Sequence, residues 1–258
     1  MFCFLQNRPA ICGTGAEISL FRLLFLLASW WFWTPSLSSA QAVDPPSQVC
    51  RTQLISKIIR GETDEAKKLI ESDKINLDAR DCTGSSALIE AVVHDETATV
   101  RLLLESGASP TVSDNRNQTP LAIAAWYCRE DAVQLLLGHG ATLEARDIDG
   151  YSPLITSVQN CADGRLTALL LRSGARVDAK SKNGTTALTS AAFFGNEQAV
   201  YILIAAGADT EAKTTSGETA LSIARDRRVG RKLAHDRIFS FLLRLADQRF
   251  ELSSSISR

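Results

Sequence analysis

The residue types that most often carry catalysis or bind metal are sparse in this chain and follow no recognised spacing. It contains three histidines at unrelated positions, His94, His139 and His235. No two of them have the i, i+4 spacing that places two metal ligands on one helix face. The sequence also lacks a Gly-x-Ser-x-Gly nucleophile motif and a glycine-rich phosphate loop after a strand. We therefore expect a non-catalytic protein without a metal or a cofactor.

The cysteines give no stronger sign of a metal site. Downstream of residue 42 lie Cys50, Cys82, Cys128 and Cys161, and no two of them form the Cys-x-x-Cys pair that is typical of zinc or thioredoxin-like sites. Charge is nearly balanced, with 28 Lys and Arg against 29 Asp and Glu. This balance argues against a nucleic-acid partner, which usually requires a basic surface. The apolar fraction of 45% is sufficient for a sizeable core.

The amino-terminal region has the pattern of an export signal. Residues 23–33 read LLFLLASWWFW, and Pro35 and the small residues of Ala40-Gln41-Ala42 follow them. This apolar run is shorter than the roughly 20 residues that a membrane-spanning helix needs. It therefore favours a cleaved secretory signal peptide over residues 1–42, with an uncleaved anchor as the alternative. Residues 43–49 are expected to form a linker, and the mature protein should have no stable membrane span.

This pattern predicts an exported protein. The compartment would be the periplasm in a Gram-negative bacterium, and the protein would otherwise be secreted.

The rest of the chain repeats itself every 33 residues. Four full copies are aligned by this period, at residues 81–113, 114–146, 147–180 and 181–213, and the third copy has one extra residue. A degenerate unit over residues 50–80 precedes them, and an irregular unit over residues 214–250 follows. The last residues, 251–258, are expected to be disordered.

The repeated motifs resemble those of the ankyrin repeat family. TPLAIAA (119–125) and SPLITSV (152–158) are similar to the family's T-P-L-H-x-A motif, although the histidine is absent. ESGAS, GHGAT, RSGAR and AAGAD are similar to its Gly-Ala motif after the second helix. The resemblance implies an all-α solenoid of stacked helix-turn-helix units with β-hairpin fingers over residues 50–250. It also implies that the chain binds another protein, and we expect the chain itself to be a monomer.

The same residues make physical sense without the resemblance. A serine or threonine precedes each apolar run, where its hydroxyl can accept a hydrogen bond from a free backbone N–H: Ser86, Thr119, Ser152, Thr186 and Thr219. Pro120 and Pro153 follow directly, at the first helical position, where proline is well tolerated. Each copy therefore predicts an amino-terminal cap followed by a helix.

The resemblance implies a binding surface on the concave side, formed by the fingers and by the exposed ends of the first helices. Carried onto this sequence position by position, it gives these residues: Trp126, Tyr127, Gln159, Asn160, Phe193 and Phe194 at helix ends, and Arg116, Ile148, Tyr151 and Lys182 on fingers. Helical geometry independently turns Phe193 and Phe194 away from the buried position of Leu188. The alternative is that the aromatic rings cover the core from within.

Cys128 and Cys161 occupy the same position in adjacent copies. Stacked helices lie about 8–10 Å apart, whereas a disulfide needs Cα atoms within about 7 Å. The extra residue near Asp163 and Gly164 offers a way to close this distance, and an exported protein meets oxidising conditions. A Cys128–Cys161 disulfide and two free thiols therefore both remain open.

Three classes of function follow from the sequence. An exported, non-catalytic protein-binding module is favoured, with a secreted effector as a variant of it. An envelope-tethered scaffold is the second class, and an uncleaved amino terminus would support it. An enzyme built on the repeats is the third, and no motif supports it. The basic residues around 225–237 are either a solvated end face or a site for an acidic partner.

Overall fold

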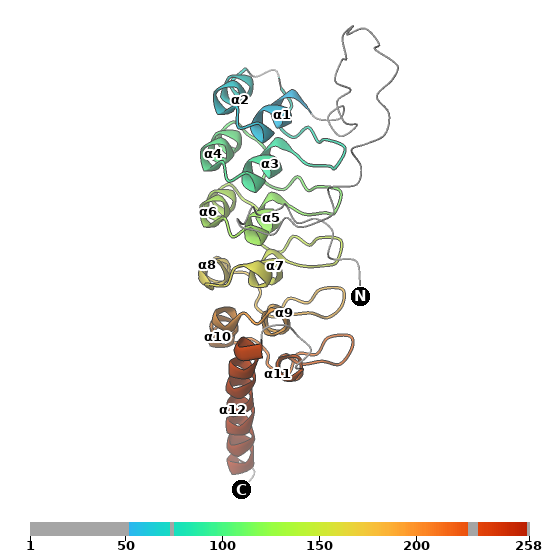
Figure 1. Cartoon of the computed structure of the whole chain (residues 1–258), viewed down its shortest axis with the longest axis vertical. Coiled ribbons are helices and arrows are strands. Elements are labelled where there is room, and N and C mark those ends of the chain that lie inside the picture. Colours follow the sequence, from blue (N-terminus) through green and yellow to red (C-terminus); the bar gives the residue numbers. More distant parts are fainter. Residues whose placement is uncertain (1–51, 73–74, 227–231, 257–258) are drawn as a thin grey trace, which may run out of the picture. The chain divides into compact units, whose positions relative to one another are not determined.

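Short helices in pairs make up the part of the chain that the structure, a computed structural model, describes: residues 52–72, 75–226 and 232–256 (Figure 1). The predicted signal peptide (1–42) and linker (43–49) lie outside these residues. The described helices are α1 (Gln53–Ile59), α2 (Thr63–Ile70), α3 (Ala87–Val93), α4 (Thr97–Glu105), α5 (Pro120–Trp126), α6 (Glu130–Gly138), α7 (Pro153–Asn160), α8 (Arg165–Arg172), α9 (Ala187–Phe194), α10 (Glu197–Ala205), α11 (Ala220–Arg225) and α12 (Lys232–Ile256).

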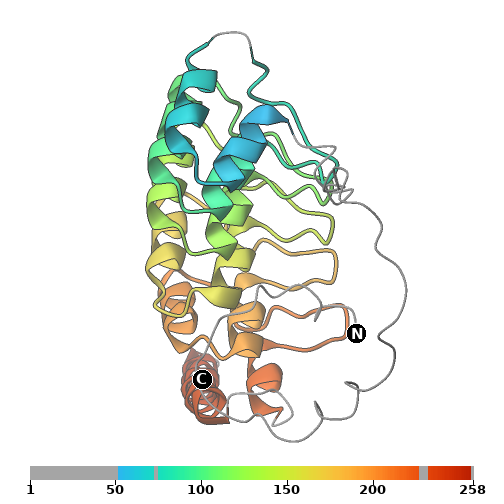
Figure 2. The same cartoon turned by 45° about the horizontal axis from the view of Figure 1, so that its top comes forward.

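The helices form two columns (Figures 1 and 2). The odd-numbered helices α1 to α11, here called the inner helices, lie beside the long loops, and α2 to α10 form the outer column. Each inner helix contacts its own outer helix or α12, and it also contacts at least one neighbouring inner helix in the stack. One helix pair has too little apolar surface to form a core alone, so the stack buries a continuous core between the columns.

The core is built from the same positions in every copy. Leu88, Leu121, Leu154 and Leu188 lie at one position of four inner helices, and each is at most 1% exposed. Each such leucine contributes about 1.5–3 kcal/mol relative to an exposed side chain. Alanines on α3, α5 and α9 are fully buried and let neighbouring inner helices approach closely: Ala91, Ala124, Ala125, Ala191 and Ala192.

The predicted amino-terminal caps are confirmed. In each case the hydroxyl accepts a hydrogen bond from the backbone N–H three residues later, at Ser86, Thr119, Ser152, Thr186 and Thr219. Pro120 and Pro153 are the first residues of α5 and α7, as predicted. Replacing a cap of this kind with alanine typically costs about 1 kcal/mol.

The loops before the inner helices, here called the fingers, are closed turns. In each finger a backbone N–H bonds to the carbonyl four residues later, as from Asp147 to Tyr151. Each finger also bonds to the next through one backbone hydrogen bond, as from Ile148 N–H to the Arg116 carbonyl. The predicted all-α repeat solenoid is confirmed, but within the described residues β-type pairing is confined to one bridge, between Arg80 and Ser86.

The carboxy-terminal end differs from the sequence prediction. Helix α12 continues to Ile256, so residues 251–256 are helical where a disordered tail was predicted. The reason is that no glycine or proline follows Lys232 to end the helix. Among the described residues, no helix has both the length and the apolar character needed to cross a membrane.

Candidate functional site

Four large aromatic side chains stand at the ends of two inner helices and are exposed to solvent. Trp126 ends α5 and Tyr127 caps it, and their exposed fractions are 37% and 42%. Phe193 and Phe194 end α9, and their exposed fractions are 42% and 41%. The two phenylalanine rings contact each other edge to face, with centroids 5.2 Å apart. Much of each ring therefore remains available for contact with another molecule.

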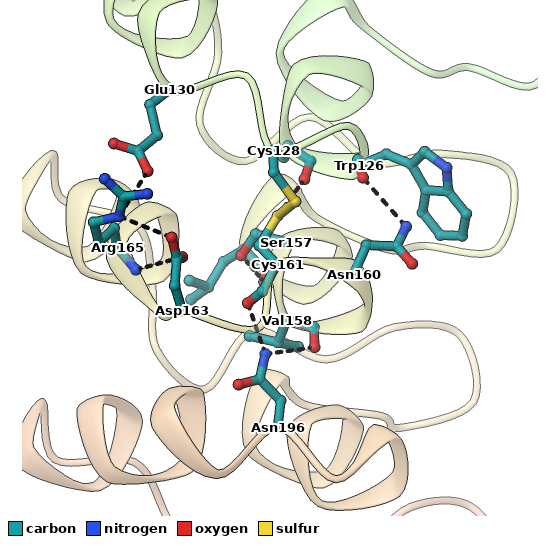
Figure 3. Close-up of a disulfide and its surroundings, with 12 residues drawn as sticks. Trp126, Cys128, Glu130, Ser157, Val158, Asn160, Cys161, Asp163, Arg165 and Asn196 are labelled. Atoms are coloured by element: carbon teal, nitrogen blue, oxygen red, sulfur yellow. Dashed lines mark hydrogen bonds and ion pairs between the residues drawn. A yellow bond between two sulfur atoms is a disulfide. The ribbon is translucent and has the colours of Figure 1, made fainter. Parts of the chain in front are cut away.

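Helix α7 lies between α5 and α9 and ends with two amides. Gln159 is half-buried and Asn160 is exposed. The Asn160 side-chain amide donates to the carbonyl of Trp126 at 3.2 Å, so it joins the ends of α5 and α7 (Figure 3). We call the exposed ends of these three helices the helix-end surface, which consists of Trp126, Tyr127, Gln159, Asn160, Phe193 and Phe194.

The predicted finger residues lie on three successive fingers. Arg116, Ile148 and Lys182 are exposed, and Ile148 is 44% exposed. Backbone hydrogen bonds connect the fingers. The Ile148 N–H donates to the Arg116 carbonyl at 2.9 Å, and the Lys182 N–H donates to the Asp149 carbonyl at 3.1 Å. The structure thus brings these three residues onto neighbouring fingers that are joined by backbone hydrogen bonds.

Tyr151 differs from its predicted role. It is half-buried and packs against the hydrophobic core, whereas the family resemblance places it on the binding surface. Burial raises the pKa of its phenol, and the nearby carboxylates of Asp149 and Asp147 raise this pKa further. The ring lies beside the large apolar residues of the stack, which makes burial more favourable than projection into solvent.

Asp147 organises the finger that carries Tyr151. Its Oδ1 accepts hydrogen bonds from the N–H groups of Asp149 at 3.0 Å and Tyr151 at 2.8 Å. Burial raises the pKa of the Asp147 carboxyl, although these two hydrogen bonds act in the opposite direction. The Asp147 carboxylate therefore stabilises the turn of this finger and has a structural role.

Four inner helices end in the same way. The residue after the last helical turn is left-handed, with φ values of 69° at Gly61 after α1, 61° at Asp95 after α3, 58° at Cys128 after α5 and 68° at Gly195 after α9. The next N–H then reaches back to a helix carbonyl five residues earlier, as from Asn196 to Ala191 at 2.9 Å. This bond satisfies a carbonyl that the helix leaves without a partner.

Helix α7 ends differently because its repeat has one extra residue. Its cap, Cys161, has an extended backbone with φ −89° and ψ 93°. The left-handed position moves three residues on, to Gly164 with φ 71°. The regular hydrogen bond to a helix carbonyl is therefore replaced at α7 by contacts from the neighbouring repeats.

The first of these contacts is a disulfide between Cys161 and Cys128 (Figure 3). Of the two alternatives that the sequence leaves open, the structure has the disulfide rather than free thiols. The two Cα atoms are 5.6 Å apart, which is closer than stacked helices usually approach. The longer loop after α7 makes this approach possible, because it frees Cys161 from the regular helix end.

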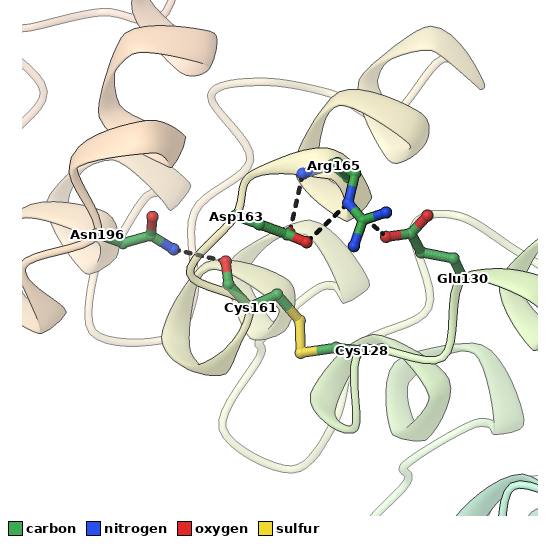
Figure 4. Close-up of polar contacts among 6 residues, drawn as sticks. All are labelled: Cys128, Glu130, Cys161, Asp163, Arg165 and Asn196. Atoms are coloured by element: carbon green, nitrogen blue, oxygen red, sulfur yellow. Dashed lines mark hydrogen bonds and ion pairs between the residues drawn. A yellow bond between two sulfur atoms is a disulfide. The ribbon is translucent and has the colours of Figure 1, made fainter.

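The second contact comes from Asn196, the cap that precedes α10 in the next repeat (Figure 4). Its side-chain amide donates to the carbonyls of Val158 at 3.0 Å and Cys161 at 2.9 Å, and its Oδ1 accepts from the N–H of Ala199. The side chain is buried, so this one residue satisfies three backbone groups in two repeats.

The third contact is an exposed ionic one. The Arg165 Nε lies 2.8 Å from Asp163 Oδ2 and 3.4 Å from Glu130 Oε1, so it bridges the second and third copies (Figure 4). Its hydrogen bond lowers the pKa of the Asp163 carboxyl. Exposed pairs of this kind contribute little to stability.

The end of α9 is contacted by α12. His235 is buried, and its Nε2 lies 3.2 Å from the carbonyl oxygen of Phe193. This ring therefore supports the backbone that carries the aromatic pair. The described residues contain no group of three or more His, Cys, Asp or Glu side chains that could hold a metal ion.

Comparison with known protein families assigns this architecture. Residues 54–147 and 154–249 match the family described as ankyrin repeats in three copies. The chain belongs to the ankyrin repeat family. Ankyrin repeats typically mediate protein–protein interactions and are generally non-catalytic. A comparison with curated proteins finds no significant match.

Two residues that matter for this ankyrin repeat stack were missed by sequence reasoning. Asn196 caps α10, where the caps of α4, α6 and α8 are Glu96, Arg129 and Gly164, so its type marks it as a helix cap but not as a donor to α7. His235 lies in the irregular last unit, where the repeat gives no register. Neither contact has a local sequence signal, because both partners lie in another repeat.

Proposed function

We propose that the protein binds another protein through the helix-end surface and the adjacent fingers, without catalysis. The observation that carries this proposal is the exposure of Trp126, Tyr127, Phe193 and Phe194, each close to two-fifths. Exposed aromatic anchors beside amides such as Gln159 match the composition of interface hot spots.

The partial exposure of the rings also favours binding over internal cover. A ring that served only to cover the core would be buried, as Leu188 is at 1% exposure. The fingers add Arg116 and Lys182, whose exposed charges can orient a partner. We expect the partner's contact surface to carry apolar side chains that fit between the aromatic pairs.

The proposal is tested by substituting the aromatic anchors singly. Trp126→Ala and Phe194→Ala should each weaken binding of a captured partner by about thirtyfold or more, since hot-spot truncations commonly cost about 2 kcal/mol. The melting temperature should change little. Capture from an extract of the source cells, followed by affinity measurement with the purified partner, gives the readout.

Leu243→Ala is the matched control, because Leu243 is a 41% exposed apolar residue on α12 and is not one of the residues of the helix-end surface. It should leave both binding and melting unchanged. Marked unfolding of Trp126→Ala and Phe194→Ala, with no selective loss of any partner, would assign the rings to the core and reject the proposal.

We also propose that the mature protein is an exported monomer that begins near Val43. The apolar run and small residues of the amino terminus support export, and a disulfide is favoured in an oxidising compartment. Intact-mass measurement of the protein from the periplasmic or extracellular fraction tests this, together with its mass in solution. A soluble cytoplasmic protein that retains residues 1–42 would contradict it.

A further inference from the structure

The Cys128–Cys161 disulfide lies directly next to the helix-end surface. Cys128 follows Trp126 and Tyr127, and Cys161 follows Gln159 and Asn160. The covalent bond thus joins the two backbone segments that carry four of the six residues of this surface (Figure 3). The disulfide therefore fixes the position of these two backbone segments relative to each other.

The other contacts between these two helix ends are weak. The Asn160 amide bond to the Trp126 carbonyl is exposed, and so is the Arg165 contact to Glu130. Exposed hydrogen bonds and ion pairs are readily exchanged for water. Helix α7 also lacks the regular end that fixes α3, α5 and α9. The disulfide is therefore the strongest of these links between the ends of α5 and α7.

The backbone conformation of Cys128 also supports a specific role for the disulfide. It is left-handed, with φ 58°, at a position where the first and fourth copies have Asp95 and Gly195. Aspartate and glycine tolerate this conformation better than cysteine does. A cysteine is thus placed against its local preference where it can reach Cys161 in the next repeat.

We propose that this disulfide is a redox-controlled cross-link that holds the helix-end surface in its binding arrangement. The proposal rests on the proposed function for its biological meaning. When the bond is intact, Trp126 and Tyr127 keep a fixed position relative to Gln159 and Asn160. When it is reduced, the two helix ends relax toward ordinary helix spacing and the surface loses its arrangement.

The reductant would be a dithiol. Cys128 is exposed and Cys161 is buried at 3% exposure, so the attacking thiolate bonds to the Cys128 sulfur. The bond between the cysteines breaks, and Cys161 leaves as a thiolate that takes up a proton. The second thiol of the reductant then releases Cys128 as a thiol, and the reductant departs as its own disulfide. Two electrons pass from the dithiol to the protein.

In the reduced state the buried Cys161 thiol has a hydrogen-bond acceptor nearby. The Cys161 sulfur lies 3.3 Å from the carbonyl oxygen of Ala125, to which a protonated thiol can donate a hydrogen bond. Reduction therefore does not leave a buried charge, and the stack can remain folded while the helix ends loosen.

A synthetic antibody fragment serves as the test probe, because it does not depend on a natural partner. It is selected on the oxidised full-length protein and required to lose binding to Trp126→Ala. A second fragment, directed against the outer helices α2 and α4, is the control probe. Both affinities are measured with oxidised protein, with dithiothreitol-reduced protein and with the Cys128→Ser/Cys161→Ser variant.

We expect the first fragment to bind at least tenfold more weakly to reduced protein and to the variant, while the second fragment binds all forms equally. The variant is needed because Cys82 is also disulfide-bonded and is reduced by the same treatment. With the variant, dithiothreitol should have no further effect on the first fragment.

Hydrogen exchange measured by mass spectrometry separates loosening from unfolding. Reduction should accelerate exchange at the ends of α5 and α7 at least tenfold and leave α9 and α10 unchanged. Equal affinity and exchange in both redox states would overturn the proposal, and so would exchange that rises throughout the chain. The proposed function can fail independently of the redox proposal. This would be the result if no natural partner required Trp126 for binding while the first antibody fragment still bound more weakly to reduced protein.

Discussion

The junction between the first and second full copies and the junction between the second and third are held by different means. At the first, α3 ends regularly and an exposed ion pair joins Asp95 to Arg129 at 2.7 Å. At the second, α7 ends irregularly and the Cys128–Cys161 disulfide joins the two copies. One inserted residue thus replaces a local helix stop with long-range contacts. A repeat stack tolerates an insertion when its neighbours satisfy the backbone groups that the insertion leaves free.

The largest expected effect is loss of the disulfide. Cys128→Ser/Cys161→Ser should lower the unfolding free energy by about 3–4 kcal/mol, because the bond closes a loop of about 33 residues in the unfolded chain. Chemical denaturation of wild type and variant measures this. Arg129→Gln at the regular junction should change stability by less than about 1 kcal/mol. Equal losses at both junctions would remove the distinction drawn between them.

Asn196→Ala comes next. It removes the donor to two buried carbonyls and the cap of α10, and we expect a loss of about 3 kcal/mol. Asn160→Ala is the matched control, since its amide bond is exposed and should be worth less than about 0.5 kcal/mol. Thermal denaturation of both variants provides the comparison. A stable Asn196→Ala protein would mean that water replaces the amide at the end of α7.

Gly164→Ala should lower the free energy of unfolding by about 2 kcal/mol, because the backbone there is left-handed and the added methyl group would be crowded. The added Cβ would lie 2.5 Å from Ile202 Cδ1 in α10, and φ is 71°. Gly174→Ala is the control, because its φ is 97° but no atom lies within 4 Å of an added Cβ. The control should lose about half as much, since only the backbone strain remains. Equal losses would show that α10 yields to the new methyl group.

Arg165→Gln should have the smallest effect. The arginine lowers the pKa of Asp163 below its ordinary value of 3.8, so the attraction is present above that pH and is lost as the pH falls through the lowered pKa. A small decrease in melting temperature at neutral pH should therefore vanish in acid. Thermal melts of wild type and variant from neutral to acidic pH test this prediction. A difference in melting temperature that persists when Asp163 is protonated would contradict the assigned ion pair.

The candidate site could be predicted in part. Repeat register predicts which residues stand at helix ends, and helical geometry predicts that Phe193 and Phe194 turn away from Leu188. Both phenylalanines are exposed, as expected from that geometry. Tyr151 was not predictable in the same way, because a finger residue has no helical period to set its direction. Its burial depends on how closely the finger approaches the core.

The sequence by itself determined the helix pairs, their capping hydroxyls and the repeat that stacks them. Each of these features depends on residues within a few positions of one another, so the local pattern contains the required information. Tertiary structure alone decided the contact of His235 with Phe193 and the support of α7 by Asn196. It also decided between a disulfide and free thiols, because the 5.6 Å approach of Cys128 and Cys161 depends on how the loop after α7 directs the backbone toward the preceding repeat.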